Sequence, residues 1–190
     1  MSDSSNDGAN VVSALERLSR LMRAGEHAGD LNPVQWEALR YLSRANRFSN
    51  SPIAMTRYLG STKGTVSQTI KALERKGYIA KTARGLERRS IVLALTDKGR
   101  DMLSNDPLTA FSKSVGELRG KTVRRLSKGL GALLEAELVR TEQPRFGACI
   151  SCRYFRERGR EGDASGPHSC MLFDAGLSDV EAQLICVEHS

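Results

Sequence analysis

The stretch IAMTRYLGSTKGTVSQTIKALERKGYIAKTARGLERRSIVLAL, residues 53–95, decides the fold of this chain. It opens with a short helical pattern in which Ile53 and Ala54 are expected to share a buried stripe, and Gly60 ends that pattern in a tight turn. A second helix over residues 62–76 follows, because its apolar residues recur at steps of three and four. Two helices joined by a short turn that contains Gly are typical of a helix-turn-helix.

The residues after the second helix predict a β-hairpin. Thr62 or its neighbour Ser61 is placed to cap the second helix and Gly77 to end it. Two extended runs then flank a basic loop centred on residues 83–85, which predicts a hairpin with a charged tip, or wing. Over residues 53–90, Lys and Arg outnumber Glu by nine to two, an excess equal to the formal net charge of +7 of the whole chain. We therefore expect one cationic surface made by the second helix and the wing.

Three motifs occur together within residues 31–103. They are GTVSQTIKALERKGYI (64–79), ERRS (87–90) and LALTDKGRDML (93–103). In combination they resemble the winged helix-turn-helix of the MarR family of bacterial transcriptional regulators. The family usually has Asp where this chain has Glu87, with an Arg two residues later, here Arg89. The resemblance implies a mainly α fold with a small β wing, a dimer formed by N- and C-terminal helices, a role as a repressor, and no enzymatic activity.

The second helix is expected to enter the major groove of double-stranded DNA with its N-terminal residues nearest the bases. Its polar residues that remain once the core face is assigned are Lys63, Thr65, Ser67, Gln68 and Lys71. Gln68 can pair with an adenine edge and Lys63 with guanine, whereas the other three are expected to hold phosphates. Roughly two of these five side chains are expected to face water without a specific contact.

The wing supplies three further candidate DNA contacts, Arg84, Arg88 and Arg89. A guanidinium can enter the narrow, electronegative minor groove of A·T-rich sequence. Arg89 has a second interpretation, because an ion pair with Glu87 would make it a structural brace. Each phosphate that is neutralised steepens the dependence of affinity on salt, so we expect DNA binding to weaken strongly as salt is added.

The flanking segments predict a homodimer. Residues 1–9 are small and polar and are expected to form a disordered tail. The segments 10–30 and 104–143 are predicted to be dimerisation helices, because each carries an apolar stripe for which the chain offers no partner. The stripes comprise Val11, Leu15, Leu18, Leu21 and Met22 in the first segment and Leu126, Leu130, Leu133, Leu134 and Leu138 in the second. Twofold symmetry would place two recognition helices about 34 Å apart, which predicts a palindromic operator.

Other features of the sequence restrict the class of protein. The chain has no run of eighteen apolar residues and no signal peptide before its first helix, so we expect a cytoplasmic protein without a membrane partner. It has no phosphate loop, and its three histidines, His27, His168 and His189, lie in unlike segments, which argues against an enzyme. Trp36 is expected in the core, although the family resemblance also implies a small-molecule effector between its helix and the dimer helices.

All four cysteines lie in the segment 144–190, beyond the family resemblance. They are Cys149, Cys152, Cys170 and Cys186, with the spacing C-x2-C-x17-C-x15-C. Two thiolates separated by two residues can turn to one metal, and the two single cysteines complete a four-thiolate cage. An iron–sulfur cluster is the first expectation, since uneven spacing suffices for it, and zinc, which more often takes two pairs, is the alternative.

Other interpretations of the cysteines stay open at this point. The thiols can be inert core residues or a redox centre in a thiol enzyme, although CISC (149–152) lacks the βαβ setting of a thioredoxin-like protein. His168 or His189 can replace one thiolate. An apolar shell for the metal is expected from Phe146, Tyr154, Phe155, Leu172, Phe173 and Leu177. If the metal centre is regulatory, its gain, loss or oxidation beside the dimer helix would change the distance between the two recognition helices. If zinc is only structural, the effector is expected to be a small molecule instead.

Overall fold

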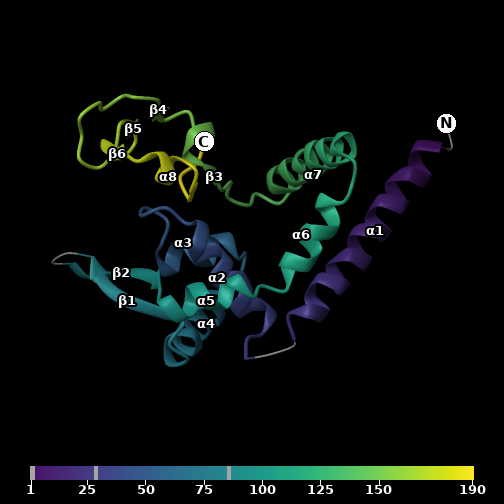
Figure 1. The fold of residues 1–190 in the computed structure, drawn as a ribbon, viewed down its shortest axis with the longest axis horizontal. Coiled ribbons are helices and arrows are strands. Elements are labelled where there is room, and N and C mark those ends of the chain that lie inside the picture. Colours follow the sequence, from purple (N-terminus) through teal and green to yellow (C-terminus); the bar gives the residue numbers. More distant parts are fainter. Residues whose placement is uncertain (1–2, 28–29, 85–86) are drawn as a thin grey trace.

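The computed structural model describes residues 3–27, 30–84 and 87–190, and the side chains of residues 3–5, 84 and 87–90 lie outside that description. The winged-helix domain comprises α2 (Pro33–Arg44), α3 (Pro52–Tyr58), α4 (Lys63–Arg75), β1 (Ile79–Arg84), β2 (Glu87–Leu95) and α5 (Asp97–Ser104). Three further helices lie to one side of this domain (Figure 1): α1 (Asp3–Gly25), α6 (Leu108–Gly116) and α7 (Gly120–Arg140). The fold is therefore mainly helical with a small β wing, as the sequence predicts.

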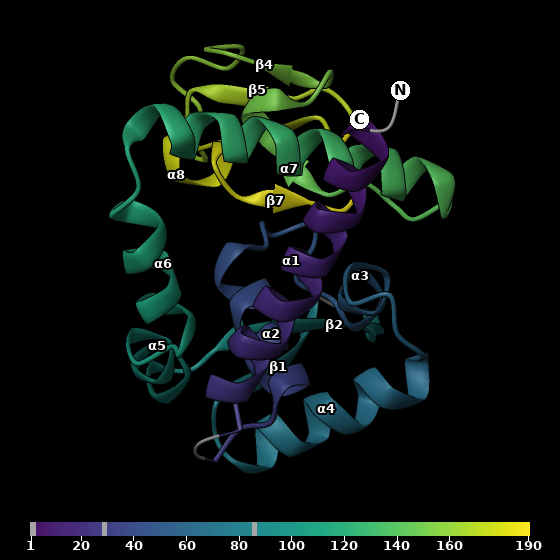
Figure 2. The same ribbon diagram turned by 90° about the vertical axis from the view of Figure 1, so that its right-hand side faces the viewer.

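A C-terminal module follows α7. Its elements are short: β3 (Gly147–Ala148), a 3-10 turn (Cys149–Ser151), β4 (Phe155–Arg156), β5 (His168–Cys170), β6 (Ala175–Leu177), α8 (Asp179–Ala182) and β7 (Ile185–Cys186). Strand β3 pairs with β7, and β5 lies between β4 and β6, all in antiparallel pairs. The module packs above α2 and α3, whereas α4 lies on the far side of these helices (Figures 1 and 2).

Side-chain caps fix where the helices of the winged-helix domain begin. Asn32 and Gln35 form a reciprocal capping box at α2, with Pro33 in the first turn. The N-cap of α4 is Thr62, whose hydroxyl accepts a hydrogen bond from the Thr65 amide at 3.1 Å. Ser51 and Thr96 cap α3 and α5 in the same way.

Glycines end the two helices of the helix-turn-helix. Gly60 and Gly77 have φ of +55° and +76°, a conformation that a residue with a side chain adopts only at a cost. After Gly77 the chain enters the antiparallel wing, in which Ile79 of β1 pairs with Leu95 of β2. The turn that separates the two helices and the hairpin that follows them are thus set by these two positions, as expected.

The core of the winged-helix domain lies between α2, α4 and the wing. Leu39, Tyr41, Leu73 and Leu93 are fully buried there, and Trp36 is only 4% exposed. Trp36 is a core side chain, as the sequence predicts, and its indole nitrogen has no hydrogen-bond partner among the described residues.

Two local expectations need correction. Helix α1 begins at Asp3, so the described part of the expected tail is helical; the backbone hydrogen bonds of a helix already formed extend outward at small cost per residue. Ile53 is 70% exposed, and Met55 takes the buried position on α3 instead. The reason is the phase of α3, which starts one residue before Ile53 and turns that side chain away from the core.

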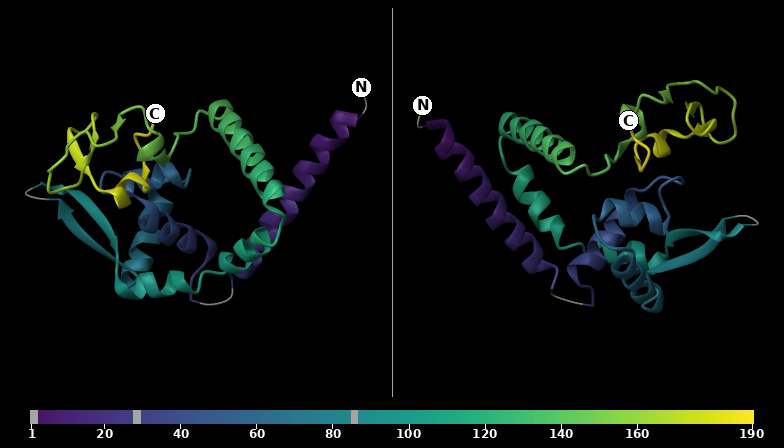
Figure 3. Two further views of the ribbon diagram at one scale, coloured as in Figure 1. Left: turned by 45° about the horizontal axis from the view of Figure 1, so that its top comes forward. Right: turned by 180° about the vertical axis from the view of Figure 1, so that it is seen from behind.

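The apolar stripes of α1 and α7 remain largely uncovered within this chain. Leu21 of α1 is 68% exposed and Leu134 of α7 is 61% exposed. Both helices project away from the core of the winged-helix domain, and α6 connects that domain to α7 (Figure 3). None of the helices in the described part of the chain is long and apolar enough to cross a membrane.

A buried ion triad holds the flanking helices to α2. Arg40 donates two hydrogen bonds of 2.6 Å to Asp106, just before α6, and a third to Glu26, just after α1. Burial alone would raise the pKa of Asp106, but its hydrogen bonds from Arg40 and from the Leu108 amide hold that pKa below its usual value. Arg40 therefore joins three segments that are distant in the sequence.

Replacement of Arg40 by Met is expected to lower the free energy of unfolding by about 3 kcal/mol, because the buried Glu26 carboxylate and the half-buried Asp106 carboxylate lose their partner. Ionised Asp106 stabilises the wild type fully above its unfolded pKa, near 4, and this stabilisation is lost as the pH falls through the lower pKa of the folded state. The difference in unfolding free energy between the wild type and the variant therefore becomes smaller in acid. Urea denaturation at several pH values measures both effects. Arg20→Met, which removes an exposed ion pair with Glu16, is the control, and an equal loss in both variants contradicts the assignment.

Candidate nucleic-acid interface and thiol site

Helix α4 presents one apolar and one polar face. Val66, Ile70 and Leu73 are buried in the core, at spacings that place them on one side of the helix. The opposite side carries the residues expected to contact DNA, and all of them are exposed: Lys63, Thr65, Ser67, Gln68 and Lys71. The Thr65 hydroxyl lies 2.9 Å from that of Thr62 and so takes part in the cap as well.

A groove of about 360 Å³ runs between α3, α4 and the wing. Lys63, Ser67 and Lys71 line it from α4, and Lys81 lines it from β1. Ile53 forms part of its wall, which gives this exposed side chain a place that the sequence pattern did not reveal. The groove joins the exposed face of α4 to the wing in one continuous surface.

The positive charge of residues 53–90 is less concentrated than expected. Lys76 forms an ion pair with Asp30, Lys81 with Glu74, and Arg57 with Glu188 of the C-terminal module. Lys63 and Lys71 make no ion pair with any residue in the described ranges, so they retain their full charge for a polyanion. Lys63 and Lys71 therefore contribute positive charge to the exposed face of α4.

The wing residues Arg84, Arg88 and Arg89 belong to β1 and β2 at the outer end of the hairpin. Arg84 is paired in register with Glu87 across the two strands. The side chains of all four residues lie outside the described part of the structure, so the contacts expected of them, including the Glu87–Arg89 pair, stay predictions.

The four cysteines meet in the C-terminal module. Cys149 and Cys152 flank the 3-10 turn, while Cys170 ends β5 and Cys186 ends β7. All four line one cavity of about 10 Å³, although no three His, Cys, Asp or Glu side chains in the described ranges are already arranged to hold a metal ion. The fold thus brings together residues that are up to 37 positions apart in the sequence, and a metal would need the thiols to close further around it.

Most of the expected apolar shell surrounds these thiols. Tyr154, Phe155, Leu172, Phe173 and Leu177 line the same cavity. Phe146 does not; its ring packs edge-on against Tyr58 and Tyr41 in the core of the winged-helix domain. The reason is its position just before β3, where the chain still runs along that domain.

The two histidines near the cysteines are engaged elsewhere. The Nε2 atom of His168 lies 3.0 Å from Asp179, and its Nδ1 atom accepts a hydrogen bond from the Arg158 amide. His189 lies 3.0 Å from the Ser151 hydroxyl. Neither histidine lines the thiol cavity, whose lining contains the four cysteines and one carboxylate, that of Glu188, which forms an ion pair with Arg57.

Two of the thiols are coupled to each other. The hydrogen bond that Cys149 makes with Cys186, together with burial, raises the pKa of Cys149. The same bond, with further donors from Glu188, Asn46 and Ser49, lowers the pKa of Cys186 to about 6. Of the two thiols, Cys186 is therefore the one whose thiolate, the form that binds a metal, is favoured.

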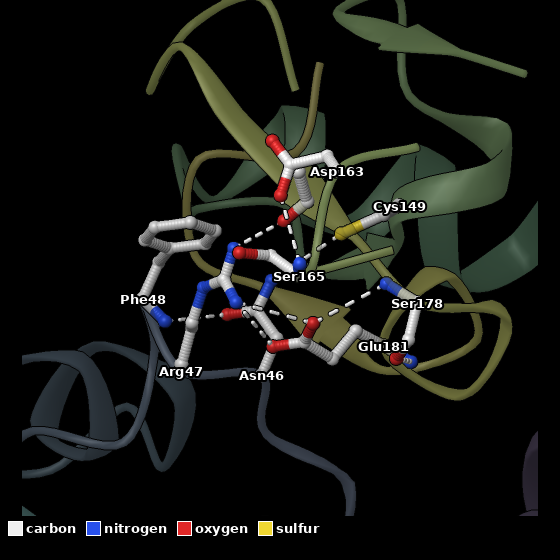
Figure 4. A network of polar contacts seen from close by, with 9 residues as sticks. Asn46, Arg47, Phe48, Cys149, Asp163, Ser165, Ser178 and Glu181 are labelled. Atoms are coloured by element: carbon white, nitrogen blue, oxygen red, sulfur yellow. Dashed lines mark hydrogen bonds and ion pairs between the residues drawn. The ribbon is translucent and has the colours of Figure 1, made fainter. Parts of the chain in front are cut away.

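A side chain from the winged-helix domain completes this site. Asn46, in the connection between α2 and α3, is fully buried and donates from Nδ2 to the sulfur of Cys149 at 3.3 Å. Figure 4 shows it beside Arg47 and Phe48, facing the module. No sequence pattern indicates this role, because the connection ANRFSNS (45–51) has only the composition of a loop.

Comparison with known proteins concerns the winged-helix part of the chain. Residues 29–90 match the model of the MarR family. The fold is shared with a MarR transcriptional regulator from Methanosarcina mazei, with a TM-score of 0.56, 22% identity, and 70% of this chain and 97% of that chain covered. It is also shared with FabT of Streptococcus pneumoniae, solved in complex with DNA, with a TM-score of 0.55, 21% identity, and 70% and 96% coverage. No curated protein matches the sequence.

In the reduced, metal-free protein, one thiolate is expected to form as the pH rises through about 6, because Cys149 donates a hydrogen bond to Cys186. The ultraviolet absorbance of the thiolate, followed as a function of pH, measures this titration. Cys149→Ala removes the donor and should move the transition toward the ordinary thiol range, whereas Cys152→Ala should leave it in place. An unchanged titration in Cys149→Ala contradicts the coupling.

Proposed function

We propose that the protein is a DNA-binding transcriptional repressor of the MarR type, whose family model matches residues 29–90, and that it binds a palindromic operator as a homodimer. The observation that carries the proposal is the exposed polar face of α4, which has Lys63 and Lys71 unpaired among the described residues beside a wing. The structures of FabT and of S. aureus MepR, which shares 19% identity with this chain, were solved with DNA bound, which supports this use of the fold. Regulators of this family are not enzymes.

The apolar faces of α1 and α7 support the homodimer. These faces lie on helices that flank the winged-helix domain in sequence and contact little of it. In water, exposed stripes of this length favour association with a complementary surface, and a second copy of the chain supplies one. The symmetric dimer would then carry two α4 helices for two half-sites of DNA.

A cleft beside the ion triad offers space for a small-molecule effector. It has a volume of about 510 Å³ and is lined by α1 and α2 residues that include Met22, Arg23, Glu37 and Arg40. Burial raises the pKa of Glu37 in its wall. A ligand there would contact both a dimer helix and the winged-helix domain, which is the arrangement needed to alter their relative position.

We further propose that Cys149, Cys152, Cys170 and Cys186 bind a metal centre. The convergence of all four thiols on one cavity, with an apolar shell, supports this assignment. Four sulfur donors suit either an iron–sulfur cluster or tetrahedral zinc, and either group would cross-link segments that have little core of their own. Cys149 is only 6% exposed, so it is poorly placed to exchange disulfides with a substrate, which disfavours a thiol enzyme.

Replacement of Gln68 by Ala is expected to lower the affinity for a specific operator by 10- to 100-fold or so, because a bidentate contact to a base is worth about 1–3 kcal/mol. Lys71→Ala should weaken binding to all duplexes alike and make the salt dependence shallower by about one unit. Fluorescence anisotropy with an operator selected from random duplexes, measured at several salt concentrations, tests both. Lys113→Ala on α6 is the control, and wild-type affinity in all three variants contradicts the interface.

The purified protein is expected to contain metal, and its visible absorption identifies the group. A brown protein has an iron–sulfur cluster, and a colourless protein with stoichiometric zinc has a structural ion. Replacement of any one of the four cysteines by Ser should lower the metal content measured by elemental analysis, while Ser151→Ala, inside the same motif, should not. Metal retained after Cys186→Ser contradicts the four-thiol assignment.

A further inference from the structure

The C-terminal module docks on the winged-helix domain of its own chain. One contact segment is residues 45–51 between α2 and α3, here named the docking loop. The Asn46 amide donates to the Ile185 carbonyl of β7 at 3.0 Å, and the Val187 amide donates to the Ser49 hydroxyl at 2.8 Å. Ala45 forms a parallel bridge with Ile185 as well. The docking loop therefore acts as an additional partner of the strand that carries Cys186.

Side chains of the docking loop strengthen this contact on the module's other elements. The ring of Phe48 stacks on that of Phe173, with centroids 4.2 Å apart and planes 9° from parallel. Arg47 forms an ion pair of 3.2 Å with Glu181 of α8 and donates to the Gly176 carbonyl of β6 (Figure 4). Phe173 lines the thiol cavity, so the loop contacts the wall of that cavity directly.

Asn46 connects the loop to the thiols themselves. Its Oδ1 atom accepts a hydrogen bond from the Phe48 amide at 3.0 Å, which fixes the side chain and leaves Nδ2 to donate to Cys149. A hydrogen-bond donor to sulfur orients a thiolate ligand and stabilises its charge. Asn46 is thus a positioning residue of the thiol site that belongs to the DNA-binding domain.

The other side of the docking loop contacts the elements that carry the DNA-binding surface. The Tyr41 hydroxyl of α2 donates to the Ser49 carbonyl, and the Leu93 amide of β2 donates to the Asn50 carbonyl at 2.8 Å. Ser51 ends the loop as the N-cap of α3. A displacement of the loop would therefore be felt by α2, by the start of α3 and by the wing.

We propose that the docking loop transmits the metal state of the four thiols to the DNA-binding surface, with Asn46 and Phe48 as the linking side chains. Closure of the thiols on a metal pulls on Asn46 and Phe173, and the loop passes this movement to α3 and β2. The module lies across α2 and α3 from α4, so it acts through the loop and does not need to touch DNA at α4 (Figure 2). This inference rests on the proposed metal site and on the proposed operator binding.

The test uses the full-length protein and Co²⁺ as the metal probe, because Co²⁺ bound by thiolates absorbs visible light. Operator affinity of the wild type is expected to differ by about 10-fold between Co²⁺ and chelator, a common magnitude for coupling between sites. Phe48→Ala should keep the Co²⁺ absorption but bring the ratio of the two operator affinities, with Co²⁺ and with chelator, close to one.

Asn46→Ser should weaken Co²⁺ binding by about 10- to 100-fold, because the residue that holds the metal ligand Cys149 in place is lost. Val180→Ala, on the module but 71% exposed, is the control and should behave as wild type.

Each result has a distinct meaning. A wild type that does not bind DNA defeats the proposed function, and one that does not bind Co²⁺ defeats the metal site and the coupling with it while leaving operator binding intact. Equal operator affinity with Co²⁺ and chelator, or full coupling in Phe48→Ala, overturns the role of the loop alone. If a variant fails to fold, hydrogen exchange of the wild type still tests the role of the loop. The Asn46, Val187 and Leu93 amides should gain protection together when Co²⁺ binds. Unchanged protection of these amides also overturns the role of the loop.

Discussion

The C-terminal module has too little apolar material to fold by itself, and this shortage determines how it is attached. Its buried apolar cluster contains only Cys149, Leu177 and Cys186, with Phe48 of the winged-helix domain among the few residues packed against it. Strands of two or three residues supply few backbone hydrogen bonds. Small domains of this kind depend on cross-links, metals or a neighbouring surface. Here the neighbouring surface is the loop between α2 and α3, and the thiols are placed where a metal would add a cross-link.

The winged-helix domain is stabilised in a different way. Its core of Leu, Tyr and Trp side chains is continuous, and its helices begin at side-chain caps that lie in the sequence at each start. Arg40 then ties the ends of α1 and α6 to α2 through buried carboxylates. Both flanks of the domain, the helices α1 and α6 on one side and the thiol module on the other, therefore contact α2 or the loop that follows it.

Much of the winged-helix domain follows from local sequence patterns. The caps at Asn32 and Thr62, the turns at Gly60 and Gly77, and the spacing of Val66, Ile70 and Leu73 each specify structure over a few residues, and these predictions are confirmed. Once the buried face of α4 is assigned, the remaining residues of the helix define its exposed face. Contact with DNA at Gln68 or in the wing stays a prediction, because a single chain shows which residues are free and not what they bind.

The parts that sequence reasoning missed depend on contacts between distant segments. Ile53 lost its expected burial because α3 starts at Pro52, a phase that periodicity over seven residues does not define. Asn46 and Phe48 gave no local signal, since their partners Cys149 and Phe173 lie about a hundred positions later. The cysteine spacing and the apolar residues around it indicated a shared site within the module, without indicating which other segment would complete it.

Trp36 offers a consequence of a different kind. It is the only tryptophan in the chain, it is buried in α2, and the Arg40 guanidinium lies 5.6 Å from its ring. Indole emission responds to a nearby charge, so this ring is a built-in optical reporter at the junction of α1, α6 and the winged-helix domain. Any event that moves Arg40 relative to α2 can be followed by the wavelength and intensity of Trp36 fluorescence in unlabelled protein, with no signal from a second indole.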